Sequence, residues 1–220
     1  MSSQKAFTPA RAPLPGTTES TDHIDPDVHR LHPTLAESTL EREVVYQGKF
    51  LKLRRDVARL PDGSSNSREF VVHPGAAAMV PIADDGRILV ERQFRYGPGR
   101  VYVEIPAGKI DPGEDSLTTA RRELIEETGY EAASWAWLTT IHPAIGFSNE
   151  VMDIYLARDL KQVPRDLDAG EFVEIEWVTL GWLVDELRAH RLLDVKTQLA
   201  VHWLQMFDEG KLPWPAFDLR

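Results

Sequence analysis

Glutamates are concentrated between Gly108 and Tyr130, in the segment GKIDPGEDSLTTARRELIEETGY. Each residue of an α-helix turns about 100°, so Glu123 and Glu127 lie on one edge and Glu126 about 60° from Glu123. Like charges at this spacing repel each other, and this strip borders the apolar side of the helix, where unpaired charges are costly. Hard carboxylate oxygens without sulfur suit Mg²⁺ or Mn²⁺. The spacing therefore predicts a metal site.

The helix that must carry these carboxylates is predicted over residues 116–128. Asp115 or Ser116 can cap its beginning, and Gly129 can end it. Its apolar face consists of Leu117, Ala120 and Leu124. The glutamate strip is thus expected on a single, well-delimited helix.

Several other segments have the pattern of strands. They are Val44–Tyr46, Phe50–Leu60, Phe70–His73, Ala77–Ala83, Ile88–Phe94, Val101–Ile105, 150–157 and 172–178. Helices are expected near 180–189 and 195–208, and five apolar residues of the second are expected in the core: Val195, Leu199, Trp203, Met206 and Phe207. Strands mixed with a few helices predict an α/β sandwich.

The composition changes along the chain and predicts its organisation. Residues 1–38 combine proline with Ser, Thr and Ala and are expected to form a mostly disordered tail. Residues 39–75 are expected to form a small N-terminal antiparallel sheet, and residues 76–210 the main domain. Residues 211–220 are expected to be a C-terminal tail.

Composition and charge exclude several classes of function. A length of 220 residues favours one globular domain with at most a small appendage. The net charge of -10 argues against nucleic acid as a partner. The absence of cysteine excludes disulfides and thiolate chemistry and fits a reducing cytoplasm. No apolar run reaches the roughly 18 residues of a membrane span, so no membrane partner is expected.

The segment from Gly108 to Tyr130 resembles the Nudix box and fits that pattern at every fixed position. Only Tyr130 departs from family usage, which favours an aliphatic residue there. The resemblance implies a magnesium-dependent hydrolase with a Nudix-type α/β/α sandwich and a mixed sheet. It also implies that Glu123 and Glu127 are the first metal ligands and that Glu126 joins them when substrate binds.

The same resemblance implies roles for the residues around this strip. The carbonyl of Ala107 can add a metal ligand. Arg122 and Glu114 are expected to hold the loop and the helix together by a charge pair. Gly108 and Gly129 have structural roles in the motif.

Motifs outside the box resemble the ADP-ribose pyrophosphatase branch of the family. They are Arg92–Arg95, Glu104–Gly108, His142–Pro143, Gly146–Glu150 and Gly170–Glu174. The resemblance implies cleavage of ADP-ribose to AMP and ribose 5-phosphate. Two alternatives remain, namely a nucleoside diphosphate sugar such as GDP-mannose as substrate, and a Nudix-like module that binds nucleotides without catalysis.

Within the last of these motifs, Glu171 is the candidate general base and Glu174 the second choice. Arg95 follows a strand and can reach a phosphate with its planar guanidinium. Glu104 and Glu150 are candidates for contacts with ribose or phosphate.

The resembled branch also implies a homodimer. Its N-terminal sheet is exchanged between two subunits, so Arg68 and Phe50 are expected to reach the partner's nucleotide. Phe50 would then stack on a base, although packing in the core is an alternative for this residue.

Overall fold

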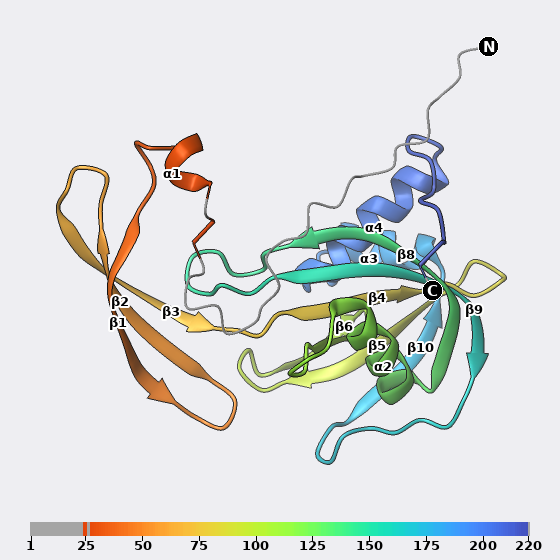
Figure 1. The fold of residues 1–220 in the computed structure, drawn as a ribbon. Helices are drawn as coiled ribbons and strands as arrows, with labels where there is room; N and C mark the ends of the chain where they lie inside the picture. Colours follow the sequence, from red (N-terminus) through yellow and green to blue (C-terminus); the bar gives the residue numbers. More distant parts are fainter. Residues whose placement is uncertain (1–23, 26, 220) are drawn as a thin grey trace, which may run out of the picture. The chain divides into compact units, whose positions relative to one another are not determined.

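The computed structural model describes residues 24, 25 and 27–219 (Figure 1). The chain divides into two compact units. The smaller unit contains the described residues up to Gly75 together with His142–Val151, and the larger unit contains Ala76–Ile141 and the chain from Met152 onward. The larger unit begins at Ala76, and the segment His142–Val151 lies in the smaller unit.

The smaller unit is built on a three-stranded antiparallel sheet in the order β1-β2-β3 (Figure 1). Its elements are α1 (Val28–Leu31), β1 (Ser38–Gln47), β2 (Lys52–Arg59) and β3 (Ser65–Val72). The loop 142–151 joins this sheet, because Asn149 Oδ1 accepts a hydrogen bond of 2.8 Å from the backbone N–H of His73. The predicted N-terminal antiparallel sheet is confirmed.

The tail predicted for residues 1–38 lies largely outside the described residues. Its described part contains α1, and Ala36 is only 6% exposed. Regular structure thus begins before residue 39, since β1 already starts at Ser38.

The described part of the larger unit contains two sheets and three helices. One sheet has the order β7-β4-β9-β8 and consists of β7 (Ala107–Lys109), β4 (Ala76–Pro81), β9 (Met152–Gln162) and β8 (Tyr130–Ile141). The other has the order β10-β5-β6 and consists of β10 (Val173–Val178), β5 (Ile88–Arg95) and β6 (Arg100–Glu104). The helices are α2 (Ser116–Thr128), α3 (Leu180–Arg188) and α4 (Val195–Asp208).

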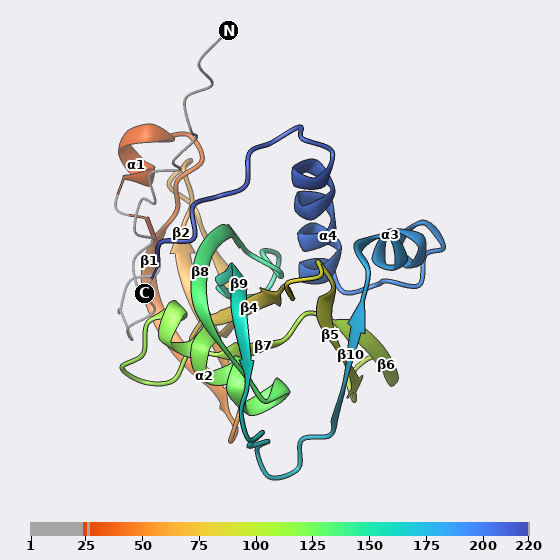
Figure 2. The same ribbon diagram turned by 90° about the vertical axis from the view of Figure 1, so that its right-hand side faces the viewer.

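The four-stranded sheet is mixed and is covered on both faces. β4 pairs with β9 in parallel and with β7 antiparallel. Every residue of β4 is buried, as expected for a strand covered on both sides. Met79 packs in one core cluster with Leu124 of α2, and Val80 packs in the other with Leu204 of α4. Figure 2 shows α2 on one side of β4 and β9 and the pair α3 and α4 on the other, which confirms the α/β/α sandwich.

The larger unit adds three details to these expectations. Strand β8 was not predicted, because its sequence YEAASWAWLTTI is buried on both faces and shows no clean alternation. Val195 is 55% exposed, because it is the first residue after the helix cap Asp194. Within the predicted C-terminal tail, Trp214 packs on Phe207 with ring centroids 4.8 Å apart.

None of the helices among the described residues has both the length and the hydropathy that crossing a membrane requires.

Candidate active site

Helix α2 has the bounds that its sequence predicts. The Asp115 side chain accepts a hydrogen bond of 2.7 Å from the backbone N–H of Thr118, which identifies Asp115 as the cap. Ser116 instead bonds the Asp153 carboxylate at 2.6 Å. At the other end Gly129 has φ 71° and donates to the Ile125 carbonyl, a left-handed position that favours glycine. These local signals fix the glutamate strip on one helix.

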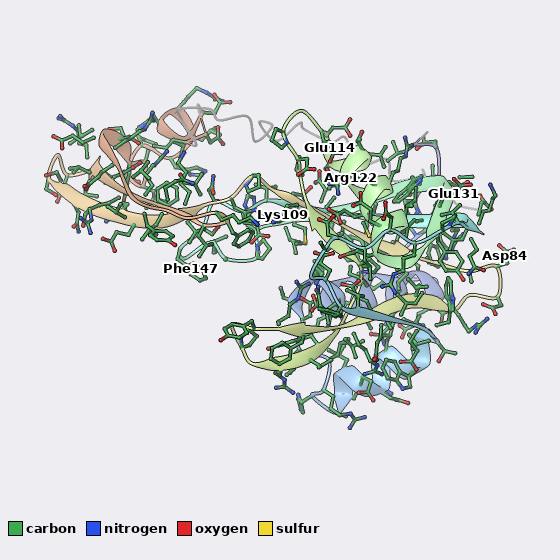
Figure 3. All side chains as sticks on the ribbon, turned by 90° about the horizontal axis from the view of Figure 1, so that it is seen from below. Asp84, Lys109, Glu114, Arg122, Glu131 and Phe147 are labelled. Carbon is green, nitrogen blue, oxygen red and sulfur yellow. The ribbon has the colours of Figure 1, made fainter. Side chains whose placement is uncertain are left out.

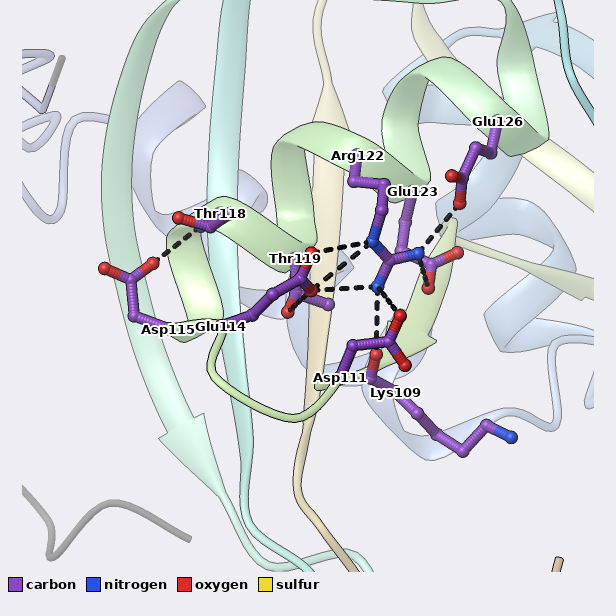
Figure 4. Close-up of polar contacts among 9 residues, drawn as sticks. All are labelled: Lys109, Asp111, Glu114, Asp115, Thr118, Thr119, Arg122, Glu123 and Glu126. Atoms are coloured by element: carbon purple, nitrogen blue, oxygen red, sulfur yellow. Dashed lines mark hydrogen bonds and ion pairs between the residues drawn. The ribbon is translucent and has the colours of Figure 1, made fainter. Parts of the chain in front are cut away.

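Arg122 is the centre of the polar network on α2 (Figure 4). Its guanidinium bonds Glu114 at 3.0 Å and both Glu123 and Glu126 at 2.8 Å. It also donates to the Lys109 carbonyl at 3.2 Å, which ties the loop before the helix to the helix itself. Figure 3 shows Arg122 and Glu114 side by side. The hydrogen bond with Arg122 holds the pKa of Glu114 below its usual range.

This network also determines how the carboxylates of the strip are held. Within the described part of the chain, no three acidic or histidine side chains form a ready metal-binding group. Arg122 holds Glu123 and Glu126 by their carboxylate oxygens. A cation at the strip must therefore compete with Arg122 for these two residues.

Glu127 is the most deeply buried carboxylate of the strip, with 4% of its surface exposed. It accepts a hydrogen bond of 3.1 Å from the backbone N–H of Ala107, so the Ala107 backbone lies beside the cluster. Burial raises the pKa of Glu127 to about 10, and the like charges of Glu91, Glu123 and Glu171 act in the same direction. Burial also raises the pKa of Glu123, although Arg122 opposes this shift.

A divalent cation fits this donor set. The donors are hard oxygens, and burial disfavours their negative charge unless a positive charge lies beside them. Gly108 leaves the room that Glu123 occupies, since a Cβ atom there would lie 1.8 Å from Glu123 Cδ. Glu123, Glu126, Glu127 and the carbonyl of Ala107 are the groups that would hold Mg²⁺.

Replacing Gly108 by alanine is expected to displace the Glu123 carboxylate. Only the end of a flexible side chain must move, so the melting temperature should stay close to that of the wild type. Activity should fall by about 10²-fold, as for other small misplacements of reacting groups. Gly97→Ala is the matched control, because a Cβ there meets nothing within 4 Å. Full activity in Gly108→Ala would contradict this role of the glycine.

Glu171 lies in the loop before β10 and acts electrostatically on the strip. Its side chain is exposed, and its negative charge raises the pKa of Glu91, Glu123 and Glu127. A residue 44 positions after Glu127 in the sequence thus lies within electrostatic range of it. The structure brings together the candidate base and the candidate metal ligands.

Glu174 occupies a different position. It lies on β10 as the register partner of Arg92, whose guanidinium stands over the Trp182 ring of α3. Paired residues of neighbouring strands share a face and successive residues alternate. Glu174 therefore lies on the α3 side of its sheet, opposite to the face of Glu91.

Arg95 is held by a buried charge network. Its guanidinium bonds the Glu104 carboxylate twice, at 2.8 and 2.9 Å, and the Lys196 ammonium bonds the same carboxylate. Lys196 also lies 3.1 Å from Asp194. Burial disfavours the charged form of Glu104, but the interactions with Arg95 and Lys196 together have the larger effect. The pKa of Glu104 is therefore lowered. Glu104 thus orients Arg95, and its predicted contact with ribose or phosphate stays a prediction.

Four buried charged residues were missed by sequence reasoning, namely Asp56, Glu91, Asp153 and Lys196. Glu91 on β5 is fully buried, and burial raises its pKa to about 7. The signal available in the sequence was a glutamate directly after the apolar residues Ile88–Val90. Lys196, which is 5% exposed, follows the cap of α4, and nothing in its sequence context indicates burial.

Three further candidates belong to the smaller unit. Arg68 on β3 bonds Glu37 at 2.6 and 2.9 Å. Phe50 lies between β1 and β2 and is 64% exposed, so it does not pack in the core of this chain. Glu150 lies 4.0 Å from His73. Their predicted contacts with a nucleotide stay predictions.

Comparison with known proteins agrees with this geometry. Residues 72–197 match the NUDIX domain family, and residues 37–71 match the nucleoside diphosphate sugar hydrolase N-terminal domain. An ADP-ribose pyrophosphatase from Bacillus subtilis is 39% identical over 175 residues, covering 79% of this chain and 95% of that protein. A methanol dehydrogenase activator from Bacillus methanolicus is 39% identical over 172 residues, covering 77% of this chain and 93% of that protein.

A second ADP-ribose pyrophosphatase, from Mycobacterium tuberculosis, is 39% identical over 156 residues and covers 70% of this chain and 74% of that protein. The crystal structure of an ADP compounds hydrolase aligns with a TM-score of 0.70 over 80% of this chain and 97% of that chain. At 22% identity this likeness shows the fold alone. Since the family match spans more than half of the sequence and includes the whole glutamate strip, the chain belongs to the Nudix hydrolases.

Proposed function

We propose that this protein hydrolyses ADP-ribose to AMP and ribose 5-phosphate in a reaction that depends on Mg²⁺, for which Mn²⁺ can substitute. The observation that carries the proposal is the desolvated carboxylate strip of α2 with Glu171 in electrostatic range of it. Similarity to two ADP-ribose pyrophosphatases at 39% identity supports the choice of substrate.

The residues of the site divide the work of this hydrolysis. When bound, Mg²⁺ neutralises the charge of the pyrophosphate and acidifies water. Glu171 accepts a proton from the attacking water while the oxygen of that water forms a bond to one phosphorus. The bond between that phosphorus and the bridging oxygen breaks, and the second phosphate leaves. Arg95, oriented by Glu104, binds a phosphate oxygen through its guanidinium.

A panel of nucleoside diphosphate compounds tests this proposal. The chain is incubated with Mg²⁺ and each compound, and release of the mononucleotide is measured. We expect ADP-ribose to have the highest kcat/KM and all turnover to stop after exhaustive chelation. Turnover that survives chelation would contradict the role of the metal.

The second candidate function is hydrolysis of a nucleoside diphosphate sugar of the GDP-mannose type. The match of residues 37–71 to the N-terminal domain of nucleoside diphosphate sugar hydrolases supports it. The carboxylate strip would serve both substrates, so only contacts to the base and sugar differ. A much higher kcat/KM for GDP-mannose than for ADP-ribose would favour this candidate. A non-catalytic binding module is disfavoured, because Glu123, Glu126 and Glu127 are all present.

The proposed active form is a homodimer whose N-terminal sheets help to bind the partner's nucleotide through Arg68 and Phe50. Apolar side chains of β1 and the turn after it are exposed in the single chain, namely Leu40, Val44, Tyr46, Phe50 and Leu51. Such exposure of large apolar residues is typical of protein interfaces.

Sedimentation at micromolar concentration is expected to show a dimer. Placing a charge on the exposed side of β1 by Tyr46→Glu should shift the chain towards the monomer, and activity should fall with it. Lys49→Glu, in the turn between β1 and β2, is the control for added charge outside the apolar set. An active monomer in the wild type would refute the dimer.

A further inference from the structure

Glu91 is a buried carboxylate for which the proposed mechanism has no role. It lies in the middle of β5 with none of its surface exposed. Neither of its carboxylate oxygens accepts a hydrogen bond from the described residues. Leaving a buried charged group without a partner costs more than the typical net gain from a hydrogen bond. A partner that supplies positive charge is therefore expected at Glu91.

The charged side chains around Glu91 do not supply this partner. Lys196 and Arg95 attract its negative charge, whereas Glu104 and Glu171 repel it. Both cations are already engaged, because each bonds the Glu104 carboxylate. Lys196 is further held by Asp194.

Glu91 is also the charged neighbour with the largest effect on Glu127. Its negative charge raises the pKa of Glu127 more than the charges of Glu123 and Glu171 do. The carboxylates of Glu91, Glu104 and Glu127 thus all act electrostatically on the Arg95 guanidinium. Two of them, Glu91 and Glu127, are buried and accept no hydrogen bond from a charged donor among the described residues.

We propose that Glu91 is a further metal ligand and shares a divalent cation with Glu127. The inference rests on the proposed metal-dependent hydrolysis and adds to it a ligand from β5, outside the helix that carries the other carboxylates. An oxygen donor set of this kind suits Mg²⁺ or Mn²⁺. The competing interpretation is that Glu91 is neutral and binds no cation.

A titration of the full chain with Mn²⁺ distinguishes these two interpretations. Binding is monitored by calorimetry and by the electron paramagnetic resonance signal of free Mn²⁺. Glu91→Gln keeps the size of the side chain and removes its charge. We expect it to bind one Mn²⁺ fewer than the wild type, or to bind one at least tenfold more weakly. The rise in melting temperature on addition of Mn²⁺ should shrink accordingly. Glu176→Gln is the matched control, since Glu176 lies on the neighbouring β10 and pairs with Arg92 at 2.8 Å.

Each outcome has a distinct meaning. If Glu91→Gln binds as many Mn²⁺ ions as the wild type with the same affinity, the inference is wrong and the proposed function stands. If the wild type binds no Mn²⁺, the proposed function fails and the inference fails with it.

Should Glu91→Gln not fold, a crystal of the wild-type protein grown with Mn²⁺ decides. An anomalous peak within about 2.0–2.6 Å of a Glu91 carboxylate oxygen supports the assignment. Anomalous peaks at the α2 strip alone, with none at Glu91, overturn it.

Discussion

Replacing Glu171 by glutamine is expected to lower kcat by about 10²- to 10⁴-fold, the usual effect of removing a general base. Glutamine keeps the size of the side chain but cannot accept the proton of the attacking water. The side chain is exposed and lies outside α2, so the hydrogen bonds of Arg122 to the glutamate strip should remain. Mn²⁺ affinity and melting temperature should therefore stay close to the wild-type values, and extra Mg²⁺ should not restore activity.

Single-turnover rates of Glu171→Gln and Glu174→Gln at saturating ADP-ribose decide between the two candidate bases. The position of Glu174 on the α3 side of the sheet predicts a much smaller loss for its variant. Near-full kcat in Glu171→Gln together with loss of activity in Glu174→Gln would refute the assignment of the base, while the membership of the family would be unaffected.

Replacing Glu127 by glutamine is expected to weaken metal binding and to cut kcat sharply, with partial restoration by excess Mg²⁺. Glutamine keeps the shape of the side chain and can still accept the hydrogen bond from Ala107, but it removes a charged ligand. Because a ligand that binds only the folded state stabilises it, the rise in melting temperature on addition of Mg²⁺ should also shrink.

When metal is absent, Glu127→Gln should instead be more stable than the wild type. Burial raises the pKa of Glu127 to about 10 from its ordinary value of 4.5, so the folded state binds more protons than the unfolded state between these values. The free energy of unfolding of the wild type therefore falls as the pH rises from 4.5 towards 10. Glu127→Gln lacks this loss and should be the more stable protein at pH 8 in chelator.

Thermal unfolding between pH 5 and 9, with and without Mg²⁺, measures both effects. Glu131→Gln is the control, because Glu131 pairs with Lys161 on the surface and lies apart from Arg122 (Figure 3). An unchanged Mg²⁺ response in Glu127→Gln would show that this carboxylate is not a ligand.

Combining the two substitutions should reduce kcat by less than the product of their separate effects. Both residues act on the same attacking water, and residues that work as a unit are not additive. A fully multiplicative loss would indicate that Glu127 and Glu171 act on separate steps.

The sequence by itself determined the helix that carries the chemistry. The candidate caps, Asp115 or Ser116 at the beginning and Gly129 at the end, delimit the helix locally. Helical periodicity converts the spacing of Glu123, Glu126 and Glu127 directly into one strip of carboxylates. The pairing of Arg122 with Glu114 was implied by the resemblance to the Nudix box, and it joins residues that are eight positions apart. These features required no knowledge of how distant segments pack.

Only the tertiary structure decided which distant groups share the site. Glu91 is fully buried on β5, which lies between β10 and β6, and its carboxylate has no hydrogen-bonding partner among the described residues. Lys196 meets Glu104 across 92 positions. The sequence had already ranked Glu171 above Glu174, and the register of β10 against β5 adds that Glu174 lies on the α3 side of its sheet. Burial, like-charge repulsion and strand register all arise from contacts between elements far apart in the chain, and periodicity within one element does not encode them.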